Sequence, residues 1–63
     1  MASVGKHIRR IRTEQHLTQE ELAETLFVTR QAVSAWETGK ALPDVETLER
    51  IAAALEVDMT EVI

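Results

Sequence analysis

The chain has 63 residues, enough for one small domain at most, and it contains no cysteine that could form a disulfide or a thiolate metal site. Hydrophobic residues make up 44% of the sequence, which suffices for one helical core. No apolar run approaches the roughly 20 residues that span a membrane, and no signal-peptide pattern follows the N-terminal basic residues. We therefore expect a cytoplasmic protein. The net charge of −4 argues against non-selective binding to nucleic acid, because such binding requires a basic protein.

The first expected helix covers about residues 3–15 and has Ser3 as its N-cap. Its apolar side chains recur at helical spacing, at Val4, Ile8 and Ile11. His16 stands where the chain must leave this helix. We expect His16 to adopt the left-handed conformation, which His tolerates better than bulky residues do.

Two short helices follow, and a tight turn joins them. Thr18 and Glu21 form a capping-box pattern that predicts a helix over about residues 19–26. Thr29 is a second N-cap candidate and predicts a helix over about residues 30–38. Because so few residues separate the two helices, they must cross at a steep angle. This is the helix-turn-helix shape, whose second helix enters the major groove of DNA.

The last part of the chain predicts two further helices. Asp44 is the N-cap of the first, and one of its faces is apolar, formed by Val45, Leu48, Ile51, Ala52 and Leu55. Asp58 and Glu61 form another capping-box pattern, which starts a final helix over residues 59–63. With no strand-like run, repeat or linker, the sequence predicts an all-α fold, a compact bundle of five short helices in one domain over residues 1–63.

The apolar residues at the end of the chain are too many for so short a helix to bury against four others. They are Met59, Val62 and Ile63. We expect them to mediate self-association, and fraying of the terminus is the alternative.

Several segments stand in a characteristic order: Gln19-Glu20-Glu21-Leu22-Ala23, then Val28-Thr29-Arg30-Gln31-Ala32-Val33-Ser34, then Trp36-Glu37-Thr38-Gly39-Lys40 followed by Pro43. In this order and spacing they resemble the phage repressor/Cro-like helix-turn-helix family, of the xenobiotic-response-element type. The resemblance covers roughly residues 4–63. It implies a lambda-repressor-like DNA-binding domain of a bacterial or phage-type regulator.

The outward positions of the helix over residues 30–38 are expected to read bases, while Val33 and Trp36 face the core. The base-reading candidates are Arg30, Gln31, Ser34 and Ala35. Arginine can donate two hydrogen bonds to a guanine edge, and glutamine can pair with both edge groups of an adenine. Alanine can contact a thymine methyl group. A merely solvated helix face is the alternative.

A second group of residues is expected to bind phosphates: Gln19, Thr29, Thr38 and Lys40. Gln19 lies at a helix N-terminus, where backbone amides favour an anion. The resemblance implies that Gln19 also braces Arg30. It further implies a structural ion pair between Arg12 and Glu37 that ties the first helix to the third, and removal of either partner would leave an uncompensated charge.

Other polar residues give weaker signals. Arg9 and Arg10 are either further phosphate contacts or a solvated face. His7 and His16 have no carboxylate partner at metal-ligand spacing, and nothing places a nucleophile beside a base. We therefore expect no enzyme activity, metal site, cofactor or small-molecule substrate.

Two residues depart from the family pattern. Phe27 and His16 occupy positions where the family often has glycine. A bulky residue at positive φ costs roughly 1–3 kcal/mol. We therefore expect either a relaxed turn at Phe27 or burial of its ring as compensation.

The charges are unevenly distributed along the chain. Residues 1–40 carry six Lys and Arg against five Glu, whereas residues 41–63 carry one Arg against six acids. We expect sequence-specific binding to double-stranded DNA as a transcriptional regulator, chiefly a repressor, through a homodimer on a palindromic operator. The alternative is a protein–protein interaction module on the same fold that uses the acidic surface of the last two helices. Both a small complete regulator and the DNA-binding part of a longer one are compatible with this interpretation.

Overall fold

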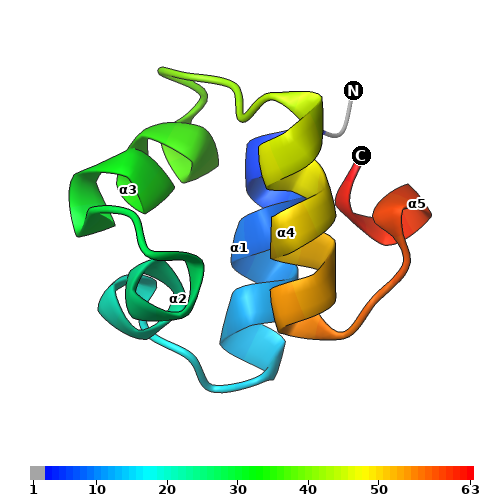
Figure 1. Cartoon of the computed structure of the whole chain (residues 1–63), viewed down its shortest axis with the longest axis horizontal. Coiled ribbons are helices and arrows are strands. Elements are labelled where there is room, and N and C mark those ends of the chain that lie inside the picture. The colour runs from blue at the N-terminus through cyan, green and yellow to red at the C-terminus, as the bar shows by residue number, and fades with distance from the viewer. Residues whose placement is uncertain (1–2) are drawn as a thin grey trace.

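The computed structural model describes residues 3–63 and contains five helices in that range. They are α1 (Val4–Glu14), α2 (Gln19–Leu26), α3 (Arg30–Thr38), α4 (Val45–Leu55) and α5 (Met59–Val62). Helices α1 and α4 stand next to each other, the α2–α3 pair packs on one side of them, and α5 covers the other side (Figure 1). The described residues form no strand, and the predicted all-α bundle of five helices is confirmed.

Four helix starts are fixed by side-chain caps that the sequence predicted. The hydroxyl of Ser3 accepts the backbone N–H of Lys6, and Thr18 and Glu21 form a complete capping box. Thr29 and Asp44 cap α3 and α4 in the same way. Each cap satisfies amides that would otherwise lack a partner at the helix end.

The predicted capping box at the start of α5 is wrong. Asp58 makes no side-chain hydrogen bond to the helix, and only the backbone N–H of Glu61 reaches the Asp58 carbonyl, at 3.0 Å. Helix α5 has only four residues and therefore little backbone hydrogen bonding of its own. It is held instead by tertiary packing, because Val62 is fully buried.

Within residues 3–63, three non-glycine residues have positive φ: His16 at 60°, Phe27 at 57° and Glu56 at 59°. The left-handed conformation expected for His16 is confirmed. Phe27 contradicts both compensations expected for it, because the turn stays left-handed and the ring is 90% exposed. Only Phe27, Val28 and the N-cap Thr29 separate the two helices, so the left-handed residue is needed to reverse the chain direction.

The core is one apolar cluster drawn from all five helices. It contains Ile8, Ile11, Leu22, Ala23, Leu26, Val33, Trp36, Ile51, Ala52, Leu55 and Val62. Two expectations fail here. Val45 was expected on the buried face of α4 but is 68% exposed. It is the first residue of α4 and lies beyond the part of this helix that the other helices pack against. Val62 was expected to help form an uncovered apolar end but belongs to the core, while Ile63 is 57% exposed.

Gly5 lets α1 approach the end of α3 closely. A Cβ atom at this position would lie 2.0 Å from the carbonyl oxygen of Trp36, which belongs to the rigid backbone of α3. A glycine inside a helix normally weakens it. Here it allows the crossing that places α3 on the bundle.

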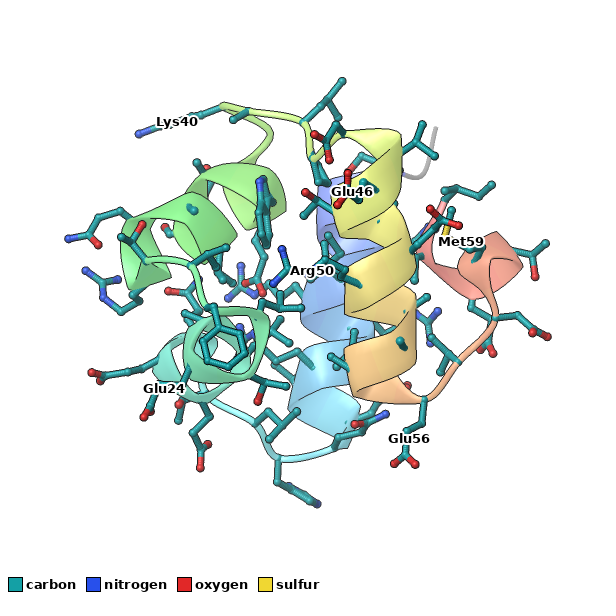
Figure 2. All side chains as sticks on the ribbon, in the orientation of Figure 1. Glu24, Lys40, Glu46, Arg50, Glu56 and Met59 are labelled. Carbon is teal, nitrogen blue, oxygen red and sulfur yellow. The ribbon has the colours of Figure 1, made fainter. Side chains whose placement is uncertain are left out.

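Polar side chains tie the helix ends together across the bundle. Gln15 donates to the carbonyl of Leu55 at 2.6 Å, and Arg50 donates to the carbonyl of Leu26 at the end of α2. Arg50 lies between α4 and the α2–α3 side in Figure 2.

No helix within residues 3–63 combines the length and the apolar character needed to cross a membrane.

Candidate nucleic-acid interface

The outward face of α3 carries the residues expected to read bases. Arg30 and Gln31, the first two residues of the helix, are exposed, and Ser34 and Ala35 lie half-buried one turn later. The opposite face is anchored in the core by Val33, which is fully buried, and by Trp36. The inner face of α3 is thus packed on the core, while the side chains at its N-terminus extend into solvent.

The expected phosphate-binding residues lie at both ends of this face. Thr29 and Lys40 are exposed, and Lys40 extends away from the body of the molecule in Figure 2. The Thr29 hydroxyl accepts the N–H of Ala32, which leaves its own proton available for an outside acceptor. The Thr38 hydroxyl is already committed, because it donates to the carbonyl of Ser34 at 2.9 Å. Thr38 is therefore the least favourable donor of the four.

A buried ion pair connects α1 to the end of α3. Arg12 donates from Nε to Glu37 Oε2 at 2.6 Å and from Nη2 to Glu37 Oε1 at 2.9 Å, and both residues are 8% exposed. Its Nη1 donates to the carbonyl of Leu17 at 2.7 Å. The hydrogen bonds to Glu37 raise the pKa of Arg12 above its usual value, so the guanidinium stays charged.

The ion pair continues to the base-reading residues. Gln19, half-buried at the start of α2, donates from Nε2 to Glu37 Oε1 at 3.1 Å. Its Oε1 accepts from Nη1 of Arg30 at 3.5 Å. One connected set of side chains therefore runs from the core to the tip of α3. The contact between Glu37 and Gln19 was missed from the sequence, because the two residues are 18 positions apart and neither occupies a recognisable pair spacing.

The remaining candidates lie on or near α1. Arg10 pairs with Glu14 at 3.3 Å, and both side chains are more than half exposed, so the pair contributes little stability. Arg9 is exposed. His7 contacts the carbonyl of Val62 through Nδ1 at 3.1 Å, which docks α5 on α1. Within residues 3–63, no group of His, Cys, Asp and Glu could hold a metal ion.

Residues 8–62 match the helix-turn-helix family, as the order and crossing of α2 and α3 led us to expect. The chain belongs to this family. It is 43% identical over 59 residues to the HTH-type transcriptional activator BcrR of Enterococcus faecalis, covering 94% of this chain and 29% of that protein. It is 52% identical over 48 residues to an HTH-type transcriptional regulator of Methanothermobacter thermautotrophicus, covering 76% of this chain and 70% of that protein.

The fold is also similar to solved structures. The P22 c2 repressor in complex with a synthetic operator superimposes with a TM-score of 0.92 and is 25% identical, covering 100% of this chain and 96% of that one. The resemblance to phage repressors inferred from the sequence is confirmed. Since this chain spans 29% of BcrR, the comparison with BcrR concerns one part of a longer protein.

Proposed function

We propose that residues 1–63 form one domain that binds double-stranded DNA sequence-specifically and serves a transcriptional regulator in the cytoplasm, chiefly as a repressor. The observation that carries this proposal is the exposure of Arg30 and Gln31 at the start of a helix that Val33 and Trp36 anchor in the core. The similarity to the P22 c2 repressor, which was solved in complex with its operator, supports the same assignment.

The mechanism is occupancy of a DNA site, with no chemical step. Helix α3 enters the major groove, where Arg30 donates to the O6 and N7 atoms of a guanine and Gln31 pairs with an adenine. Ser34 and Ala35 contact the next base edges. Gln19, Thr29 and Lys40 hold the two phosphate backbones and set the register of the helix in the groove, and Thr38 joins them when its hydroxyl leaves the Ser34 carbonyl.

A pair of domains reads the operator, because one domain of this size makes few base contacts and a palindrome offers two equal half-sites. Three exposed apolar side chains, Leu42, Val45 and Ile63, suit this pairing. The α3–α4 loop, the start of α4 and the C-terminus all lie at one end of the molecule (Figure 1).

A second copy is the occupant that the charges at this end favour. Lys40 and Glu46 both lie there, whereas Glu56 lies at the opposite end (Figure 2). A surface that meets its own copy across a two-fold axis needs either both signs of charge or none. Because the loop that carries Leu42 directly follows α3, pairing there also brings two reading helices close together.

Selection of bound DNA from a random double-stranded pool, repeated at two salt concentrations, tests the proposed function. We expect a palindromic consensus and a steep loss of affinity with salt. The Lys40→Ala variant should keep the consensus and reduce the salt slope by roughly 1, as expected for one lost phosphate contact. Failure to enrich any sequence would contradict the proposal and favour the interaction-module alternative.

A further inference from the structure

We infer that Glu37 is a positioning residue for base reading: its carboxylate fixes the orientation of the Gln19 amide, and that amide holds Arg30. This inference rests on the proposed DNA-binding function. It gives Glu37 a role beyond its ion pair with Arg12.

The chemistry of the Glu37 carboxylate allows only one orientation of Gln19. An ionised carboxylate only accepts hydrogen bonds, so the Gln19 side chain must present its NH2 group to Glu37 Oε1, 3.1 Å away. The amide oxygen then points to the other side, where it accepts from Nη1 of Arg30 at 3.5 Å. The reversed amide would set oxygen against carboxylate and NH2 against guanidinium, and both contacts would be repulsive.

The three side chains become progressively less constrained from the core to the surface. The Glu37 side chain is 2% exposed and is held by two hydrogen bonds from Arg12, which is itself bonded to the carbonyl of Leu17. Gln19 is half-buried and Arg30 is exposed. The buried carboxylate therefore acts as the fixed point from which the exposed guanidinium is oriented.

An Arg30 side chain held by Gln19 loses less conformational freedom on binding DNA than one without this contact, because it is already partly ordered. Only one of its N–H groups is occupied by Gln19. The remaining N–H groups stay available for the O6 and N7 atoms of a guanine. The contact with Gln19 thus favours a base-reading conformation of Arg30 without using up its donors.

The test compares Glu37→Met, which removes both carboxylate oxygens, with a core variant of comparable destabilisation, Ile51→Ala. A glutamine at position 37 could turn its NH2 group toward Nε of Arg12 and keep an oxygen toward Gln19, whereas methionine leaves the Gln19 amide without this acceptor. Ile51 is fully buried and belongs to neither contact, so its truncation lowers stability alone. Affinities are measured for the selected operator and for operators with single base-pair changes, at a temperature where circular dichroism shows every protein folded.

We expect Glu37→Met to lose roughly five-fold discrimination at the base pair read by Arg30, the effect of one ordinary hydrogen bond. Discrimination at other base pairs should be unchanged, and Ile51→Ala should discriminate as the wild type does. The double variant Glu37→Met, Arg30→Ala should lose no more discrimination at this base pair than Arg30→Ala alone. An equal loss at all base pairs, or an additive loss in the double variant, would overturn the inference and leave Glu37 a structural residue.

A measurement on the unmodified protein guards against a variant that fails to fold. The side-chain amide protons of Gln19 should exchange with solvent more slowly by NMR than those of the exposed Gln31. Equal exchange would overturn the contact on which the inference rests. If the wild-type chain selects no DNA sequence, the proposed function fails, and slow exchange at Gln19 would then mark a structural contact only.

Discussion

Phe27 combines two unfavourable features at one position, a left-handed backbone and a ring that is 90% exposed. Since nothing in the folded domain offsets the strain, Phe27→Gly should stabilise the domain by about 1 kcal/mol. The gain should appear as a higher urea midpoint with an unchanged slope.

The matched control is Phe27→Ala, which removes the ring but keeps the Cβ atom responsible for the strain. Its stability should stay close to that of the wild type, and neither variant should change the affinity for the operator. A Phe27→Gly protein that is less stable than the wild type would show that the ring makes a stabilising contact.

Asp44 makes the start of α4 sensitive to acid. Hydrogen bonds from the side chain and then the backbone of Thr47 hold the pKa of the Asp44 carboxyl below its usual 3.8. Because this pKa is lower in the folded state, its contribution to stability is present above the unfolded value and is lost as the pH falls through the folded one. We therefore expect part of the acid destabilisation below about pH 4 to come from Asp44.

The variant Asp44→Asn isolates this contribution, because it keeps a capping acceptor but cannot titrate. Urea unfolding at several pH values should give a shallower loss of stability at low pH for the variant than for the wild type. Two parallel curves would show that the cap does not depend on the charge of Asp44.

At the scale of the helices, the close contact between α1 and α3 depends on Gly5. In an ordinary exposed helix position, replacing glycine by alanine stabilises the helix by about 0.5–1 kcal/mol. At position 5 the sign should reverse, because the new Cβ would meet the Trp36 carbonyl oxygen at 2.0 Å and the two helices would have to separate. Thermal unfolding followed by circular dichroism measures the effect, and a raised Tm for Gly5→Ala would contradict this account of the crossing.

Local chemistry explains which helix features could be predicted. Helix starts can be predicted from the sequence, because each capping side chain bonds to a backbone N–H only three residues further on. This holds for Thr18, Thr29 and Asp44. Two side chains were predicted wrongly: Val62 is buried and Val45 is exposed, the reverse of what was expected. Their environments depend on where α5 docks and where the bundle ends. These are properties of the packed helices, and they leave no periodic signal.

The same distinction applies to the candidate site. The outward positions of Arg30 and Gln31 follow from helical spacing once Val33 and Trp36 are placed inside. The contact from Glu37 to Gln19 depends on the angle between α2 and α3, and the fit at Gly5 depends on the distance between α1 and α3. Neither quantity can be read from the pattern of apolar residues.

At the scale of the whole molecule, the proposed pairing of two domains gives a further prediction. The double variant Leu42→Glu, Val45→Glu should fold, because the two side chains are 78% and 68% exposed, but should lose self-association. Analytical ultracentrifugation over a range of concentrations measures this, and Phe27→Glu serves as a control that adds charge at an exposed apolar site elsewhere. A double variant that associates as the wild type does, or a wild type that stays monomeric even on its operator, would contradict pairing at this end.

We propose that α3 reads DNA sequence through Arg30, and a comparison of wild type and Arg30→Ala on two DNA fragments tests this role. Binding constants are measured for the selected operator and for a scrambled fragment of the same length at one salt concentration. We expect Arg30→Ala to lose about 1–3 kcal/mol of affinity for the operator and little for the scrambled fragment. Equal losses on both fragments would contradict it, because Arg30 would then be a phosphate contact.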